Sequence, residues 1–111
     1  MSESLERTGF SQSVEILVSP GMVQALVQAL TLRVGQLDRH HNGFIGASLR
    51  VSEHQGTVHL DVHWASRKAS EEASAHARPD DPDWLQVGYD YQARSIIFRT
   101  FVVYADVRAL D

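Results

Sequence analysis

Polar and apolar residues alternate without interruption along residues 57–64, TVHLDVHW. The alternation has a period of two, which predicts a β-strand with one buried face and one polar face. An earlier β-rich run at 44–52 is joined to it by the short loop 53–56, whose glycine suits a tight turn. Together the two runs predict an antiparallel hairpin. Its second strand presents Val58, Leu60, Val62 and Trp64 on one side and Thr57, His59, Asp61 and His63 on the other.

Helical patterns lie on both sides of this hairpin. Between residues 22 and 37, apolar side chains recur every three or four positions, which predicts an amphipathic helix with one buried stripe. Ser19 before Pro20 is a start signal for this helix, and Asn-Gly at 42–43 is a plausible exit turn. Residues 65–77 are rich in alanine and charge and predict a second helix, with Ser66 as its N-cap.

The remaining segments complete the predicted order of elements. A first strand is expected at 13–18 and a fourth at 96–107, both rich in β-branched or aromatic residues. Between the second helix and the fourth strand, prolines and aspartates at 78–83 predict a loop that leads into a short turn at 83–87. The order strand, helix, strand, strand, helix, strand predicts an α+β, ferredoxin-like βαββαβ fold with both helices on one face of an antiparallel sheet.

The fourth predicted strand carries apolar residues on both of its faces. Helices can cover only one of those faces, so a sheet from a second subunit is expected on the other. Residues 1–12 are expected to form a flexible leader, and residues 13–111 a single domain. The expected assembly is a homodimer.

Composition narrows the class of protein. The chain has 111 residues, no cysteine and a formal net charge of −4. The absence of cysteine excludes disulfides, thiolate metal sites and cysteine nucleophiles, and fits a cytoplasmic protein. This mild net negative charge gives no indication of the basic patch that binding of nucleic acid requires. The polar first residues carry no signal-peptide pattern, and no apolar run is long enough to cross a membrane.

Two histidines flank an aspartate on the polar side of residues 57–64, a pattern compatible with a metal site, an acid–base set or a polar face. Alternate residues of a strand lie about 6.6–6.8 Å apart. His59 and His63 are therefore too far apart to share one ion with Asp61 on a straight strand. The apolar side is expected beneath the helices, so we interpret His59, Asp61 and His63 as polar groups of a dimer interface. No metal site is predicted.

The hairpin NGFIGASLRVSEHQGTVHLDVHW resembles the central hairpin of the antibiotic biosynthesis monooxygenase family. Gly43-Phe44 matches that family's entry into the hairpin, and Gly56 matches its turn. Trp64-Ala65-Ser66 matches its junction from strand to helix, and Ser19-Pro20-Gly21 also fits before the first helix. Three departures stand out: Leu60 where aromatic-polyketide oxidases carry asparagine, Asn42 in place of proline, and Ser70 in place of a tyrosine of some members.

The resemblance implies a ferredoxin-like subunit that pairs sheet to sheet into a dimeric α+β barrel. It also implies a slot between sheet and helices, in which O₂ oxidises an aromatic phenol or anthrone to a quinone with no cofactor. Such a slot needs apolar walls and donors for an oxyanion. The residues expected at the reacting centre are Trp64, Arg99 and His76, and those expected to line the substrate pocket are Leu60, Val62, Phe44, Trp84 and Tyr89.

Each of these residues also has a plainer interpretation. Trp64 could simply fill the core. Arg99 interrupts an apolar strand, where it could bind an anionic substrate or pair with Asp61 or Glu15, and pairing is favoured. His76 could be a base or an exposed helix histidine.

Three hypotheses for the function follow. The first is a cofactor-independent monooxygenase of an aromatic or polyketide-like small molecule. The second, motivated by Leu60, is a non-catalytic ligand-binding or interaction domain on the same dimeric scaffold. The third and weakest is a haem-binding or haem-degrading relative that uses His76. No nucleic-acid or membrane partner is expected under any of them.

Overall fold

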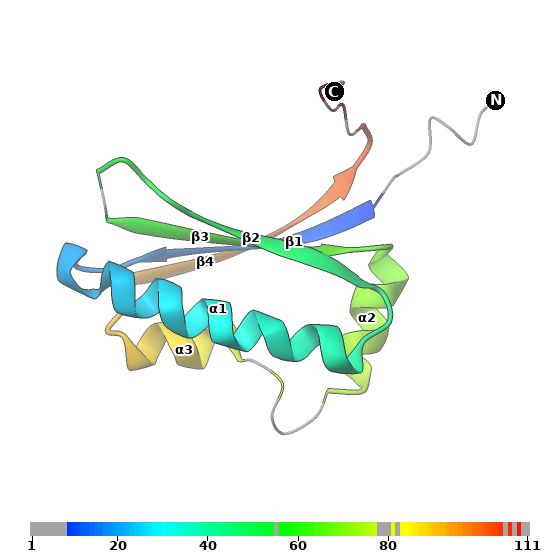
Figure 1. The fold of residues 1–111 in the computed structure, drawn as a ribbon, viewed down its shortest axis with the longest axis horizontal. Helices are drawn as coiled ribbons and strands as arrows, with labels where there is room; N and C mark the ends of the chain where they lie inside the picture. The colour runs from blue at the N-terminus through cyan, green and yellow to red at the C-terminus, as the bar shows by residue number, and fades with distance from the viewer. Residues whose placement is uncertain are drawn as a thin grey trace.

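The structure is a computed structural model that describes residues 9–54, 56–77, 81, 83–105, 107 and 109, without the side chains of 37–40. A single sheet carries three α-helices and a short 3₁₀ turn on one of its faces (Figure 1). In chain order the elements are β1 Gly9–Leu17, η2 Pro20–Met22, α1 Val23–His40, β2 Phe44–Val51, β3 Thr57–Trp64, α2 Arg67–Ala75, α3 Trp84–Asp90 and β4 Ser95–Val103.

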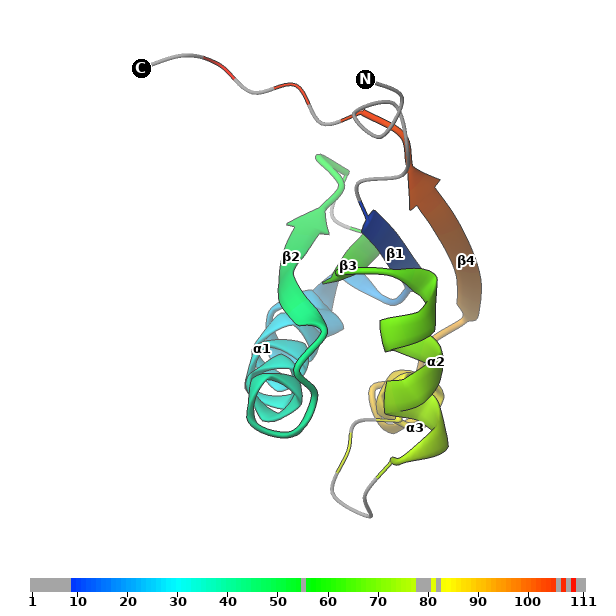
Figure 2. The same ribbon diagram turned by 90° about the vertical axis from the view of Figure 1, so that its right-hand side faces the viewer.

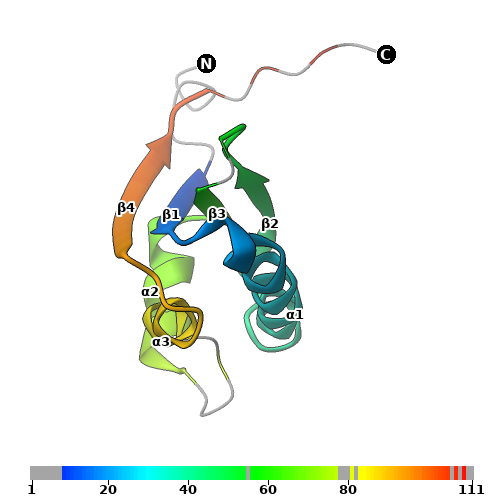
Figure 3. The same ribbon diagram turned by 90° about the vertical axis from the view of Figure 1, so that its left-hand side faces the viewer.

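The strands follow the order β2-β3-β1-β4, and each neighbouring pair is antiparallel. This is the ferredoxin-like α+β arrangement that the order of elements predicted. Helix α1 lies beneath the β2 side of the sheet, whereas α2 and α3 lie beneath the β4 side (Figures 2 and 3). Among the described residues, no helix is both long and apolar enough to span a membrane.

The pleat of β3 divides its residues as the alternation predicted. Leu60 lies opposite Val14 of β1, and both side chains are buried beneath the helices. On α1, Leu26 and Leu30 point into the same core. Full burial of a side chain of this kind contributes about 1.5–3 kcal/mol. The core consists of Phe10, Val14, Ile16, Val18, Leu26, Ala29, Leu30, Val58, Leu60, Val62, Trp64 and Val87.

Two predicted strand boundaries are corrected by the structure. Strand β1 begins at Gly9, so residues 9–12 belong to the sheet and not to the leader; residues 1–8 lie outside the described part of the chain. This strand pairs with both β3 and β4, and that pairing outweighs its polar composition. Strand β4 ends at Val103 rather than 107.

The predicted short turn at 83–87 is a helix, α3. The side chain of Asp83 accepts a hydrogen bond from the backbone N–H of Gln86 and so caps its first turn. Ser66 caps α2 in the same way, as predicted, by accepting from the N–H of Ala69.

Gly43 allows the start of β2 to approach α2. A Cβ on Gly43 would overlap the Cβ of Ala69, so only glycine fits at this contact. The carbonyl of Gly43 also accepts a 2.9 Å hydrogen bond from the N–H of Ala65, just after Trp64. This packing fixes the end of β3, where the candidate site lies.

Candidate functional site

Trp64 and Gln12 are joined by a hydrogen bond beneath the sheet. Trp64 is the last residue of β3, is 3 % exposed, and donates from Nε1 to Oε1 of Gln12 at 2.8 Å. An indole N–H can only donate, so it selects the oxygen of the Gln12 amide. The amide orientation is thereby fixed, and the Nε2 donors of Gln12 remain for another acceptor.

A cavity of about 190 Å³ lies beside this pair, between the sheet and the helices. Trp64 and Trp84 supply its aromatic surface, and Gln12 and Asp81 supply its principal polar groups. Its complete lining is Gln12, Trp64, Ala73, Ser74, Ala77, Asp81 and Trp84. An aromatic lining with a few convergent polar groups is typical of a small-molecule site.

Asp81 is held by a histidine. Nε2 of His41 lies 3.0 Å from Oδ2 of Asp81, and the two side chains are only 8 % and 10 % exposed. The imidazole also meets the Trp64 indole edge to face, with ring centroids 6.2 Å apart. His41 therefore connects the cavity's carboxyl group to its tryptophan.

The surface next to Gln12 on β4 is accessible. Thr100 lies opposite Gln12 in the β1–β4 ladder and is exposed, and Phe98, on the same helix-facing side of β4, is 53 % exposed. These residues extend an aromatic and hydroxyl surface beyond the cavity. A ligand wider than the cavity could rest on it.

Only part of the predicted pocket gathers here. Trp64 and Trp84 line the cavity, and Phe44 packs against Trp64 with centroids 5.9 Å apart, without being among the lining residues. Leu60 and Val62 are completely buried in the core and do not line the cavity. Tyr89 is exposed on α3 and does not line it either.

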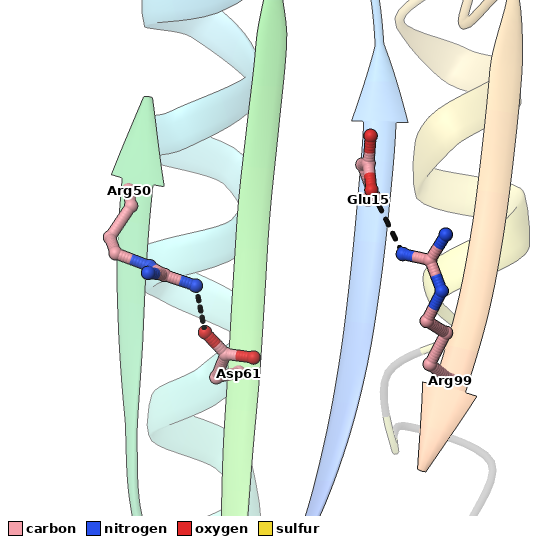
Figure 4. A network of polar contacts seen from close by, with 4 residues as sticks. All are labelled: Glu15, Arg50, Asp61 and Arg99. Atoms are coloured by element: carbon pink, nitrogen blue, oxygen red, sulfur yellow. Dashed lines mark hydrogen bonds and ion pairs between the residues drawn. The ribbon is translucent and has the colours of Figure 1, made fainter. Parts of the chain in front are cut away.

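Arg99 lies on the opposite face of the sheet from Trp64, so one chain cannot bring the two residues into one site. Its Nη1 is 3.1 Å from Oε1 of Glu15, which confirms the predicted pairing. A second ion pair joins Arg50 to Asp61 at 2.9 Å on the same face (Figure 4). The helices lie behind the strands in this view, so both pairs belong to the uncovered face.

His59, Asp61 and His63 also belong to the uncovered face of the sheet, as predicted from the alternation. In the part of the chain that the structure describes, no group of three or more His, Cys, Asp or Glu residues is arranged to hold a metal ion.

His76 is separate from the Trp64 cavity. It is exposed at the C-cap of α2, and its Nδ1 lies 3.0 Å from the carbonyl oxygen of Glu72. It lines a different cavity, of about 220 Å³, together with His41 and Glu72. The structure therefore does not bring His76 together with Trp64.

Three polar residues of the site, Gln12, His41 and Asp81, are not among the residues predicted from the sequence. Gln12 falls within the predicted leader, His41 directly before the predicted exit turn at 42–43, and Asp81 within the predicted loop at 78–83. The only local signals were the alternation around Gln12, FSQSV, and two adjacent histidines after an amphipathic helix.

The comparisons with known proteins find similarity in structure only. No family model matches the sequence, and no curated protein matches it. Among solved structures, it resembles the monooxygenase of the gene ActVA-Orf6 of Streptomyces coelicolor, in complex with nanaomycin D, at 20 % identity and a TM-score of 0.74, over 94 % of this chain and 95 % of that one.

Two further structures are similar. A candidate antibiotic biosynthesis monooxygenase from Deinococcus radiodurans has 13 % identity and a TM-score of 0.70, over 92 % of this chain and 99 % of that one. A dimeric ferredoxin-like protein from an uncultured marine organism has 13 % identity and a TM-score of 0.68, over 98 % of this chain and 100 % of that one. The resemblance to antibiotic biosynthesis monooxygenases is thus confirmed at the level of the fold.

Proposed function

We propose that this chain binds an aromatic, polyketide-like small molecule beside Trp64 and oxidises it with O₂ without a bound cofactor. The observation that carries the proposal is the Trp64–Gln12 hydrogen bond at 2.8 Å, at the wall of a cavity that both tryptophans line. This bond fixes the orientation of the Gln12 amide, so that its Nε2 donor lies next to the aromatic surfaces of the cavity. The fold likeness to a monooxygenase in complex with nanaomycin D supports the same substrate class.

The proposed reaction needs little from the protein beyond binding and charge stabilisation. An anthrone-type substrate loses a proton from its activated CH₂ group, and the resulting anion transfers an electron to O₂. One oxygen atom becomes the new carbonyl and the other leaves as water, so that R₂CH₂ and O₂ give R₂CO and H₂O. Nε2 of Gln12 is the proposed donor to the oxyanion, in place of the indole N–H, which Gln12 already occupies.

The size of the cavity limits what can be enclosed. About 190 Å³ accommodates one or two fused rings, whereas ligand sites for larger molecules usually measure about 300–1,000 Å³. A three-ring substrate would therefore extend onto the accessible side chains of Thr100 and Phe98. This arrangement favours flat substrates that enter edge first from the β4 side.

Oxygen consumption by the metal-free protein tests the proposal directly. With a panel of anthrones and quinols, we expect uptake of one O₂ per quinone formed, above the spontaneous rate. Gln12→Glu should keep the bond to Trp64 but replace the amide donor by an anionic oxygen, and so lower kcat by about 10²–10³-fold. Gln28→Glu, at an exposed position of α1 outside the cavity lining, is the matched control. A panel without uptake above background would refute the proposed activity.

A non-catalytic ligand-binding domain is the second candidate, and one observation favours it. Leu60, at the position where aromatic-polyketide oxidases carry asparagine, is completely buried and offers no polar group. Binding of naphthols or quinols without any oxygen uptake would support this alternative. Leu60→Asn is a poor test, because an amide buried there without partners costs several kcal/mol of stability.

Pairing through the uncovered sheet face is the proposed assembly. Ile97 and Phe101 are exposed apolar residues on that face, on either side of Arg99 along β4. One of the proteins with a similar fold is a dimeric ferredoxin-like protein, and this supports a homodimer as the assembly. His59, Asp61 and His63 would then lie between the two sheets.

The composition supports a cytoplasmic location for this proposed enzyme. The chain contains no cysteine, so a reducing compartment places no constraint on its folding. Expression of a tagged chain followed by fractionation would test the location.

A further inference from the structure

We infer that Thr100 determines ligand specificity beside the Trp64 cavity, where it binds a ring carbonyl of the ligand together with Gln12. The inference rests on the proposed function of this cavity as an aromatic site. It adds one residue to that site and one chemical group that the ligand must carry. The supporting observations are the register of β1 and β4, the composition of the helix-facing side of the sheet, and the exposure of Thr100.

Gln12 and Thr100 are polar residues on an otherwise apolar side of three strands. Alternate residues of β1, β3 and β4 point toward the helices, and the register aligns them in rows across the sheet. The other residues on this side are Phe10, Val14, Ile16, Val58, Leu60, Val62, Trp64, Ile96, Phe98 and Val102. A polar group in such surroundings needs a hydrogen-bond partner or contact with solvent. The two residues therefore form a polar step in a surface that otherwise suits only apolar groups.

The two polar residues are direct neighbours. Gln12 lies opposite Thr100 in the antiparallel β1–β4 ladder, and the Cβ atoms of such a pair are about 4.5–5.5 Å apart. Oε1 of Gln12 accepts from the indole of Trp64 at 2.8 Å, which leaves the Nε2 hydrogens. In the part of the chain that the structure describes, Nε2 of Gln12 and the hydroxyl of Thr100 are otherwise unpaired. A ligand oxygen placed between them can accept from both.

A ring carbonyl suits these two donors. Its oxygen has two lone pairs, so it can accept from an amide N–H and a hydroxyl at the same time. Both lone pairs lie near the plane of the ring, so a flat ligand presents this oxygen at its edge and leaves its faces free to contact aromatic side chains. If negative charge develops on the same oxygen during the proposed oxidation, two donors stabilise it in place of one.

Thr100 is open to a ligand from the β4 side. Its side chain is exposed, and Phe98, two residues earlier on the same side of β4, is 53 % exposed. A role limited to the β-strand would make threonine replaceable by valine, which is also β-branched and favours strands. Loss of the hydroxyl alone therefore separates a role in ligand binding from a role in the strand.

Binding of 1-indanone and indane tests the inference, because the two molecules have the same fused rings and differ only by a carbonyl in place of a CH₂ group. NMR titration of isotope-labelled protein under argon gives both dissociation constants without oxidation. It also observes the side-chain NH₂ group of Gln12 directly. In wild-type protein, 1-indanone should shift the NH₂ signals of Gln12, whereas indane should not. Because wild-type protein suffices for this measurement, it stands even if a variant fails to fold.

Thr100→Val removes the hydroxyl and keeps the branched shape of the side chain. It should weaken binding of 1-indanone relative to indane by about fivefold, as for the loss of one neutral hydrogen bond. Thr100→Ser keeps the hydroxyl and should keep the wild-type ratio of the two dissociation constants. Thr57→Val makes the same change on the uncovered face of β3 and is the matched control. It should leave the ratio unchanged.

The role of Thr100 is refuted if wild-type protein binds neither ligand, if 1-indanone leaves the Gln12 signals unshifted, or if Thr100→Val keeps the wild-type ratio. These outcomes are distinct from failure of the proposed oxidation, because no turnover is measured. Absent oxygen uptake would remove the oxidase proposal and leave the carbonyl selectivity intact.

Discussion

Trp64 and Gln12, 52 positions apart in the sequence, are joined by a 2.8 Å hydrogen bond between β3 and β1. The bond satisfies a buried indole N–H and fixes the orientation of an amide at the wall of the cavity. It therefore links the stability of the sheet to the chemistry of the candidate site. Both residues lie on the helix-facing side, opposite the histidines of the same strand.

A double-mutant cycle should detect this bond in the free energy of unfolding. Gln12→Leu leaves the indole N–H without its acceptor and should destabilise the fold by about 1–3 kcal/mol. Trp64→Phe should also destabilise it, through lost packing as well as the lost donor. In the double variant the losses should fall short of their sum by about 1 kcal/mol, measured by urea denaturation. Additive losses would mean that the bond contributes nothing to stability.

Gly43 should tolerate no side chain, whereas Gly46 should. A methyl group at Gly43 would overlap the Cβ of Ala69, and relief of that overlap requires β2 and α2 to separate. Gly43→Ala should cost about 1–3 kcal/mol, and Ala69→Gly in the same chain should recover part of it. Gly46→Ala is the control, because nothing lies within 4 Å of a Cβ there. Equal melting temperatures for the two single alanine variants would contradict this account.

Two exposed phenylalanines of β4 lie on opposite faces of the sheet, so substitutions at these positions can distinguish the two faces. Phe101 is 49 % exposed on the uncovered face, and Phe98 is 53 % exposed on the helix-facing side. If two copies pair through the uncovered face, Phe101→Glu should raise the dimer dissociation constant at least tenfold, because it buries a charge in the interface. Phe98→Glu should leave that constant unchanged. Sedimentation equilibrium measures the dissociation constants of both variants. An equal effect of the two substitutions would exclude the uncovered face as the dimer interface.

The sequence determined the order of the four strands and the two predicted helices, the face to which each residue of β3 points, and the cap of α2. These features follow from short-range patterns. A period of two sorts the side chains of a strand, and a serine before a helix accepts from its first turn. Even the ion pair of Arg99 could be anticipated, because a charge inside an apolar strand needs a partner.

Tertiary structure alone decided which polar groups meet in the cavity. Gln12 reaches Trp64 across 52 residues and His41 reaches Asp81 across 40, and no local periodicity records such distances. It also decided that Leu60 belongs to the core and that Arg99 is on the far face from Trp64. The physical reason is that strand periodicity specifies the direction of a side chain, whereas its partners are set by sheet register and by how the helices and loops pack against that face.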